Sequence, residues 1–329
     1  MMADRSGRMR MQPLPAHIAT AALLFVTLIS GCSAAGTGVT ESGLPAANFT
    51  SAWQAMNSGT SGVMWGVWGT SAEDVFAVGE GGVSHYDGNA WSSMSNAPGS
   101  FLDGVWGSSA TNVFAVGGAL QPGGGYTGVI LHYDGHSWGA MGGSANLLAG
   151  IWGSSGSDVY AVGDAGAILH YNGTDWHSVT GITNSNLRAV WGTSAASVYV
   201  VGDRGTILHY DGSSWHVIDI GTLSALWGIW GDSPSDIFIV GSGGTILRHN
   251  GDIWAAMSTG DTNTLWGIWG DSASDIFAVG YHGTRLHYDG FRWNDVSGLA
   301  SDTYHAVWGS SPMNVFVAGN AGTILRFTG

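Results

Sequence analysis

The sequence lacks lysine: all nine of its basic residues are arginine, and only 10% of the 329 residues are charged. Acidic residues are more numerous, so the formal net charge is −14 at pH 7. Binding to nucleic acid needs a face of positive side chains that neutralises phosphates, and electrostatic docking on anionic lipid headgroups needs the same. The composition therefore excludes nucleic acid as a partner and membrane attachment by charge.

Cysteine is nearly absent, since Cys32 is the single one in the chain, and this excludes a disulfide framework. Cys32 follows three arginines and an apolar run at residues 18–30. The run is too short for a typical membrane span and fits the core of a signal peptide. Residues 29–32 read ISGC, which resembles the bacterial lipobox.

The lipobox resemblance implies that residues 1–31 are a lipoprotein signal peptide and that acyl chains are attached to Cys32. Residues 32–47 are small and polar and are predicted to form a flexible tether. We expect a protein of the bacterial cell envelope, lipid-anchored at the outer membrane, the cell surface or the periplasmic face, with the lipid as its contact with the membrane. The alternative is an ordinary secretory signal cut near Ala35, which gives a secreted protein.

Helical periodicity is also missing, and internal repetition takes its place. A Trp-Gly pair begins each of seven units, with successive spacings of 38, 46, 39, 39, 39 and 39 residues. A period near 40 residues indicates a solenoid or a propeller. The seven tryptophans are Trp68, Trp106, Trp152, Trp191, Trp230, Trp269 and Trp308.

Each unit contains four short apolar segments, rich in β-branched and aromatic residues and bounded by Gly, Asn, Asp and Ser, which predict strands. An Asp-Gly or Asn-Gly pair between the third and fourth segments is typical of a tight hairpin. Four short antiparallel strands make one propeller blade. The turn pairs begin at Asp87, Asp134, Asn172, Asp211, Asn250 and Asp289.

The two ends of the chain share one unit. The last unit stops after its third strand, at residues 321–329, and residues 48–56 supply a fourth strand with its closing tryptophan, Trp53. A closed ring uses such a split unit, whereas an open solenoid does not. The sequence therefore predicts an all-β domain over residues 48–329, a seven-bladed β-propeller of four-stranded antiparallel blades whose N-terminal strand completes the last blade.

One position of the third strand is histidine in five units and arginine in two: His85, His132, His170, His209, Arg248, His287 and Arg326. Metal ligands must converge on one point, whereas equivalent positions of a propeller lie around a wide circle, and arginine does not ligate metals. We predict hydrogen bonds to a neighbouring Asp or carbonyl, with no metal site and no cofactor. The residues that open the second strand are expected to bond their own turns: Asp74, Asn112, Asp158, Ser197, Asp236, Asp275 and Asn314.

A ligand site should break the sevenfold repetition, and two sets of positions differ between the copies. In a four-stranded meander both sets lie at one rim, around the mouth of the central channel. The first set lies three residues before each Trp-Gly tryptophan: Trp65, Asp103, Ala149, Arg188, Trp227, Trp266 and His305. The second set lies in the turn between the second and third strands and includes Glu80, Tyr126, Asp164, Asp203, Arg204, Tyr281 and His282.

From these sets we predict a ligand-binding site without catalytic residues. Its members are Trp65, Asp103, Arg188, Arg204, Trp227, Trp266, Tyr281, His282 and His305. An insertion in the second unit, residues 118–125, is expected to form a flap over the mouth. The alternative is that these loops vary because they are unconstrained, and that Trp227 and Trp266, which lie in near-copies, record a duplication.

The blade pattern resembles the repeats of bacterial secreted and lipoprotein propellers. The Gly-x-x-Trp endings, as in residues 88–91 and 212–215, are similar to the end of the Asp box of sialidase-like propellers and to the repeats of photosystem II assembly-factor propellers. The resemblance implies the fold. In the Asp box an aspartate stands where this chain has Tyr86 or Tyr210, so no catalytic residue is carried over.

Three functions remain open. The first is a monomeric binding module that holds a glycan or a protein segment at the aromatic rim, because indoles stack on sugars and bury apolar side chains. The second is a glycan hydrolase or lyase, which would need two facing carboxylates; the candidates are Asp103, Glu80, Asp164 and Asp203. The third is an assembly scaffold without a small-molecule pocket.

Overall fold

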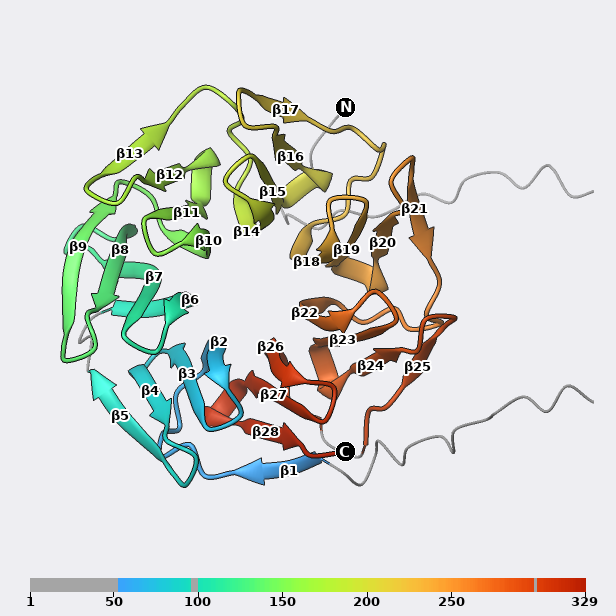
Figure 1. Cartoon of the computed structure of the whole chain (residues 1–329), viewed down its shortest axis with the longest axis horizontal. Helices are drawn as coiled ribbons and strands as arrows, with labels where there is room; N and C mark the ends of the chain where they lie inside the picture. The colour runs from blue at the N-terminus through green and yellow to red at the C-terminus, as the bar shows by residue number, and fades with distance from the viewer. Residues whose placement is uncertain (1–52, 96–99, 299–300) are drawn as a thin grey trace, which may run out of the picture. The chain divides into compact units, whose positions relative to one another are not determined.

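The computed structural model describes residues 53–95, 100–298 and 301–329. Within these residues the chain forms seven four-stranded antiparallel sheets around a common axis (Figure 1). The predicted seven-bladed, all-β propeller is confirmed. The expected signal peptide, the tether and Cys32 lie outside the described residues. The described helices are single 3-10 turns: η1 (Asp164–Gly166), η2 (Asp203–Gly205), η3 (Ser242–Gly244), η4 (Tyr281–Gly283) and η5 (Asn320–Gly322).

Each blade is a meander that starts near the axis and ends at the perimeter (Figure 1). The innermost strands are β2 (Met64–Ser71), β6 (Ser100–Ser109), β10 (Leu148–Ser155), β14 (Leu187–Ser194), β18 (Leu226–Ser233), β22 (Leu265–Ser272) and β26 (Tyr304–Ser311). The second strands are β3 (Asp74–Gly79), β7 (Asn112–Leu120), β11 (Asp158–Gly163), β15 (Ser197–Gly202), β19 (Asp236–Gly241), β23 (Asp275–Gly280) and β27 (Asn314–Gly319).

The two outer positions complete each sheet. The third strands are β4 (Gly82–Tyr86), β8 (Tyr126–Tyr133), β12 (Ile168–Tyr171), β16 (Ile207–Tyr210), β20 (Ile246–His249), β24 (Arg285–Tyr288) and β28 (Ile324–Phe327). The outermost strands are β5 (Trp91–Ser95), β9 (Trp138–Ser144), β13 (Trp176–Val179), β17 (Trp215–Val217), β21 (Trp254–Met257), β25 (Trp293–Asp295) and β1 (Trp53–Met56).

The ring closes as predicted, because β1 pairs antiparallel with β28 and completes the sheet of β26 and β27 (Figure 1). The register pairs Trp53 with Phe327 and Met56 with Ile324. Phe327 is fully buried and packs on the Trp53 indole at a centroid distance of 5.3 Å. Burial of these rings removes a large apolar area from water, so the two ends of the propeller hold each other.

The Trp-Gly pairs lock neighbouring blades together. The indole of Trp68 in the first blade lies over Gly107 in the second, where a Cβ atom would stand 2.6 Å from the Cη2 atom of Trp68. Trp308 of the last blade lies over Gly69 of the first in the same way. Glycine follows each tryptophan because the ring of the preceding blade occupies the space of a side chain.

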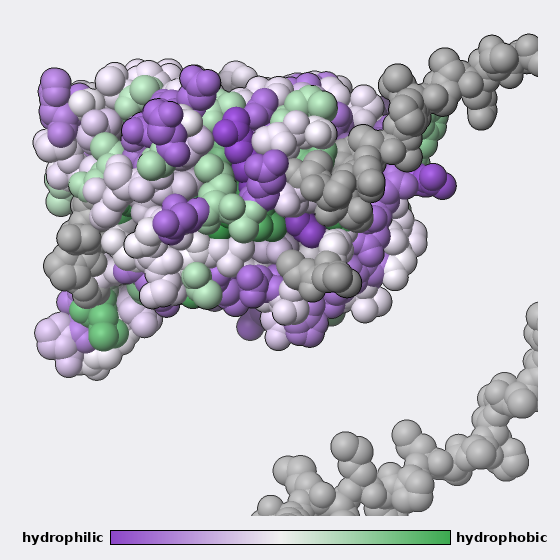
Figure 2. All heavy atoms as spheres, turned by 90° about the horizontal axis from the view of Figure 1, so that it is seen from below, coloured by the Kyte–Doolittle hydropathy of each residue, from purple (hydrophilic) through white to green (hydrophobic). Residues whose placement is uncertain are grey.

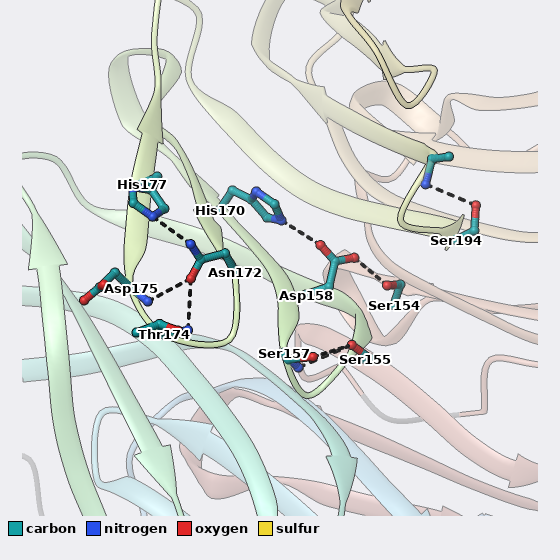
Figure 3. Close-up of polar contacts among 11 residues, drawn as sticks. Ser154, Ser155, Ser157, Asp158, His170, Asn172, Thr174, Asp175, His177 and Ser194 are labelled. Carbon is teal, nitrogen blue, oxygen red and sulfur yellow. Dashed lines mark hydrogen bonds and ion pairs between the residues drawn. The ribbon is translucent and has the colours of Figure 1, made fainter.

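The predicted role of the third-strand histidines as scaffold is confirmed where they face an acid or amide. His170 Nε2 bonds to Asp158 Oδ1 at 2.6 Å, and Ser154 donates to the other carboxylate oxygen (Figure 3). Asp158 therefore bonds its own turn, as expected, and also reaches across to the third strand. Arg248 replaces histidine by a two-bond pair with Asp236, at 2.8 Å for both bonds.

In the Asn-Gly turn of the third blade, the asparagine side chain bonds to the backbone and the glycine adopts a left-handed conformation. Asn172 Oδ1 accepts bonds from the backbone N–H groups of Thr174 and Asp175, at 2.9 Å each, and its amide contacts His177 (Figure 3). Gly173 has a φ of 92°, a left-handed conformation that glycine adopts without steric cost. Turns of this kind close the third and fourth strands at the rim opposite the start of the innermost strand.

Hydrophilic and weakly polar residues dominate the face of the molecule seen in Figure 2, where hydrophobic residues form small groups. The apolar residues of the second strands are instead fully buried between blades, as in Val75 and Val78 of β3. No helix among the described residues has the length and apolar character needed to cross a membrane.

Candidate functional site

A cavity of about 260 Å³ lies where the innermost strands meet. Each of the seven innermost strands contributes one residue to its wall, so the cavity lies on the axis of the ring. The wall residues, here called the axial set, are Trp65, Asp103, Ala149, Arg188, Trp227, Trp266 and His305. They are the first set of variable positions that the sequence singled out, and the structure brings all seven together.

The strands approach the axis closely because the residue after each axial position is small. A Cβ atom at Gly66 would lie 2.8 Å from Val78 Cγ2 and 3.0 Å from the backbone oxygen of Asp103 in the next blade. The corresponding residues in two other blades, Ala189 and Ala306, are also small. The axial side chains are consequently forced into one crowded ring, where all seven remain half-buried.

Aromatic rings from four consecutive blades form one continuous side of the cavity, here called the aromatic arc. The ring centroids of Trp227 and Trp266 are 4.4 Å apart with planes tilted by 51°. Trp266 meets His305 edge-on at 5.7 Å, and His305 lies 6.5 Å from Trp65. Such edge-on and tilted contacts are the preferred geometry of aromatic pairs.

The tryptophan count sets these three indoles apart. Of the 17 tryptophans in the chain, seven begin the repeat units and seven lie at the start of the outermost strands. The remaining three are Trp65, Trp227 and Trp266, and all three line the cavity. Every tryptophan that the repeat does not require therefore lies on the axis.

Arg188 stands next to the arc, but its charge is already compensated. Its Nε and one terminal nitrogen bond to Asp203 at 3.0 and 2.8 Å, and the other terminal nitrogen lies 3.3 Å from Asp164. The bonds with Arg188 lower the pKa of Asp203, so this carboxylate is ionised. The guanidinium carbon lies 4.8 Å from the centre of the Trp227 ring, a cation–π contact.

Three axial side chains each form a hydrogen bond with a residue of their own blade at a fixed spacing. The partner lies fifteen positions after the axial residue, at the start of the turn that follows the second strand. Arg188 binds Asp203 in this way, Trp227 Nε1 donates to Ser242 Oγ at 3.0 Å, and His305 Nε2 donates to Asn320 Oδ1 at 2.8 Å. These turns therefore orient axial side chains rather than line the cavity.

Asp103 receives no such partner. Its fifteenth successor is Gly118, and among the described residues its carboxylate has no hydrogen-bonding partner. Burial raises the pKa of Asp103 to about 7, with Arg188 acting in the opposite direction and Asp164 in the same one. An unpaired carboxyl group in a cavity, with a pKa close to neutral pH, is a candidate functional group.

His305 is held in one state by its surroundings. Burial lowers the pKa of its imidazole, and the bond to Asn320 requires a proton on Nε2. At neutral pH His305 is therefore an uncharged ring that extends the aromatic arc. Within the residues that the structure describes, no three His, Cys, Asp or Glu side chains are grouped as a metal ion would require.

Three predicted site residues do not line the cavity. Tyr281 and His282 stack on each other at 4.0 Å in η4 and are exposed, and Arg204 is exposed in η2. Arg204 and His282 have φ values of 56° and 54°, in the left-handed region that non-glycine residues seldom adopt. They lie in turns at the rim outside the axial set.

The insertion in the second blade lengthens a hairpin. β7 and β8 stay paired as far as Leu120 and Tyr126, and the turn between them includes Gln121 and Gly125. Tyr126 meets Phe101 edge-on at 5.0 Å, and Phe101 in turn packs edge-on against Trp65 at 5.5 Å. The expected flap is thus a hairpin that supports Trp65; its residues are not in the cavity wall.

Sequence reasoning did not include Ala149 among the site residues, although it noted the position. Ala149 lines the cavity between Asp103 and Arg188 and is the smallest residue of its wall. Ser242 and Asn320 belong to the second set of variable positions, but the predicted site did not include them. A polar residue fifteen positions after a variable one is the signal that identifies them.

Comparisons with known proteins show the fold. Neither a family model nor a curated protein sequence matches the chain. The solved structure of YCF48 bound to D1 peptide is 17% identical with a TM-score of 0.68, covering 84% of this chain and 95% of that one. YCF48 from Cyanidioschyzon merolae is 15% identical with a TM-score of 0.66, covering 84% and 98%. The WD40 repeats of RRP9 are 11% identical with a TM-score of 0.68, covering 84% and 97%.

At these identities the likeness concerns the fold and not the ligand. YCF48 is a photosystem II assembly factor, so the resemblance to such propellers is confirmed at the level of architecture. The likeness to the WD40 repeats of RRP9 likewise concerns the arrangement of the blades.

Proposed function

We propose that this propeller is a binding protein that holds a segment of a polypeptide partner at the axial cavity. The observation that carries the proposal is the break in symmetry at the axis. The packing positions of the blades repeat, whereas the seven axial positions hold five residue types and all three tryptophans outside the repeat. A concave, largely aromatic site with a few polar groups is the usual form of a binding pocket.

The size of the cavity favours a side chain as the inserted group. About 260 Å³ is below the usual range for drug-sized ligands, roughly 300–1,000 Å³, and suits one or two side chains. The exposed turns with Arg204, Tyr281 and His282 lie at the rim outside the axial set and would offer contact area for the rest of a chain. The peptide bound by YCF48 supports this choice by analogy of fold alone.

A glycan is the second candidate for the ligand. The indoles of Trp227 and Trp266 favour it because they are half-exposed and aromatic, as sugar-stacking residues are. Their planes are tilted by 51°, however, so the two rings do not form one flat platform for a pyranose. The tilt gives a polypeptide side chain the better fit.

Catalysis has weaker support than binding. A hydrolase mechanism needs two carboxylates that face each other across the substrate. Among the described residues, Asp103 is the one carboxylate in the cavity wall. Asp164 and Asp203 hold Arg188, and Glu80 accepts a bond from the backbone N–H of Val63.

The proposal can be tested with a variant in which a large side chain fills the cavity. Ala149→Trp replaces the smallest wall residue by an indole, and Ala140→Trp, on the exposed outer strand β9, is the matched control. Both variants and the wild type are applied to a random peptide array and a glycan array, after thermal unfolding has shown that they are folded. We expect peptides that bind the wild type and the control but not Ala149→Trp. Equal binding by all three proteins would overturn the site.

We also propose that the binding module is held at the bacterial envelope through Cys32, on the strength of the lipobox at residues 29–32. Several acyl chains on one cysteine give stable anchoring. Cys32→Ser should move the protein from the membrane pellet to the soluble fraction of its host cells, and should stop incorporation of labelled palmitate. Retention of Cys32→Ser in the pellet would contradict the anchor.

A further inference from the structure

We propose that the group inserted into the axial cavity is the ammonium of a lysine side chain, with Asp103 as its counter-ion and the aromatic arc as its wall. This inference rests on the proposed binding function and names the chemistry of the ligand. It follows from three features of the cavity: its charge, its unused aromatic faces and the missing partner of Asp103.

The charges around the cavity select a cation. Asp103, Asp164 and Asp203 face a single guanidinium, that of Arg188, which already bonds to the latter two. An anionic ligand would therefore meet the unpaired carboxylate without a free positive partner. A cation finds in Asp103 an acceptor that no described side chain occupies, and burial strengthens such a charge pair relative to water.

The aromatic arc provides the second element of cation recognition. Tryptophan is the best of the aromatic side chains at binding a cation over its face. The guanidinium of Arg188 already lies over the ring of Trp227, whereas among the described residues no cation lies over the ring of Trp65 or Trp266. Trp65 also belongs to the blade next to that of Asp103, so carboxylate and free indole adjoin. The methylene stem of lysine matches these apolar walls while its tip carries the charge.

The unpaired state of Asp103 is specific to its blade. Three other blades provide a polar partner fifteen residues after the axial position, and the second blade has Gly118 there. Phe101 and Leu147 enclose Gly118 in β7, at 3.1 Å from the position of a Cβ atom, so a side chain at this position would not reach the carboxylate without a shift. A buried acid without a partner destabilises the fold, and an incoming ammonium would remove that cost.

The binding should depend on pH in a defined direction. Asp103 shares the cavity wall with Arg188 and His305, and Asp164 acts on it from η1; burial lowers the pKa of His305, whose ring is neutral near pH 7. A cation binds the ionised form of Asp103, whose pKa is about 7 in the free protein. Affinity should therefore rise about tenfold from pH 6 to pH 8, as the carboxylate loses its proton while lysine keeps its charge.

The experiment compares two cationic probes with uncharged analogues. Acetyl-Gly-Lys-Gly-amide and its norleucine analogue, and choline and its neutral analogue 3,3-dimethylbutan-1-ol, are titrated into the full-length protein by ligand-observed NMR. The variants are Asp103→Asn, which keeps the shape of the carboxylate, and Asp252→Asn, which removes the same charge from an exposed turn at the opposite rim. The array result with Ala149→Trp tests the proposed function separately.

We expect the lysine peptide to bind at least fivefold more tightly than the norleucine peptide, and choline more tightly than its neutral analogue. The preference should vanish in Asp103→Asn and persist in Asp252→Asn. Equal binding of lysine and norleucine peptides would overturn the inference while leaving a binding site blocked by Ala149→Trp intact. Binding of choline without binding of the lysine peptide would overturn the assignment to a polypeptide side chain.

Discussion

Single residues at equivalent positions of the seven blades experience different surroundings, and those of Asp103 are the least favourable to its charge. The pKa of this carboxyl is raised to about 7 by burial, above that of an aspartate in an unfolded chain. The folded protein therefore binds a proton that the unfolded chain has already lost between about pH 4 and pH 7. Stability falls as pH rises through that window.

Asp103→Asn removes this dependence on pH. We expect the melting temperature of the variant to exceed that of the wild type, by an amount that grows from pH 4 to pH 7 and is constant above. Thermal unfolding at a series of pH values measures the difference. A variant that is less stable than the wild type at pH 8 would show that Asp103 has a partner that stabilises its ionised form.

The glycine of each Trp-Gly pair is required because the tryptophan of the neighbouring blade fills the space of a side chain. Gly107→Ala places a Cβ atom 2.6 Å from Trp68 Cη2 and should destabilise the protein by about 1–3 kcal/mol, the usual effect of overpacking. Gly139→Ala in β9 meets nothing within 4 Å and is the control. Denaturant unfolding of both variants compares them; similar losses would contradict the blade contact.

Within each blade, hydrogen bonds between strands follow the sequence position by position. In six blades the third-strand histidine or arginine bonds to the residue that opens the second strand, and in three blades the axial residue bonds to the one fifteen positions later. The fourth blade departs from the first pattern, because Ser197 opens its second strand in place of an acid or amide, and His209 Nε2 is buried without a partner. Burial lowers the pKa of His209 accordingly.

Ser197→Asp should restore the pair. We expect NMR titration to show a raised His209 pKa, because a carboxylate favours the charged ring. The gain in stability belongs to pH values below the new pKa and is lost as pH rises through it. Ser197→Ala is the control and should leave the pKa lowered. An unchanged pKa in Ser197→Asp would mean that the aspartate does not reach the ring.

The repeat pattern of the blades determines how much of the site could be predicted from the sequence. Repeats of equal length place equivalent residues in one ring, so the axial set followed from alignment of the units alone. The turn residues were less predictable. Arg204 and His282 have a left-handed backbone, and the sequence of one repeat does not show this turn geometry. The unpaired state of Asp103 required the structure, since it depends on Gly118 and on what surrounds it.

At the scale of the whole molecule, closure of the ring turns seven similar blades into one site. The fold was predictable because the split last unit, completed by Trp53, has a use only in a closed propeller, and β1 does pair with β28. Closure brings the first strands to a common axis, where residues from all seven blades enclose one cavity. The likeness to the YCF48 and WD40 propellers agrees with this architecture.

The tryptophans report directly on whether this cavity is the binding site. Protein labelled with 5-fluorotryptophan, its resonances assigned by Trp→Phe variants, is titrated with acetyl-Gly-Lys-Gly-amide and followed by fluorine NMR. The resonances of Trp65, Trp227 and Trp266 should shift with one common affinity while the other fourteen of the 17 stay in place. Shifts confined to the other fourteen, or no shift in any of the three, would contradict a ligand site on the axis.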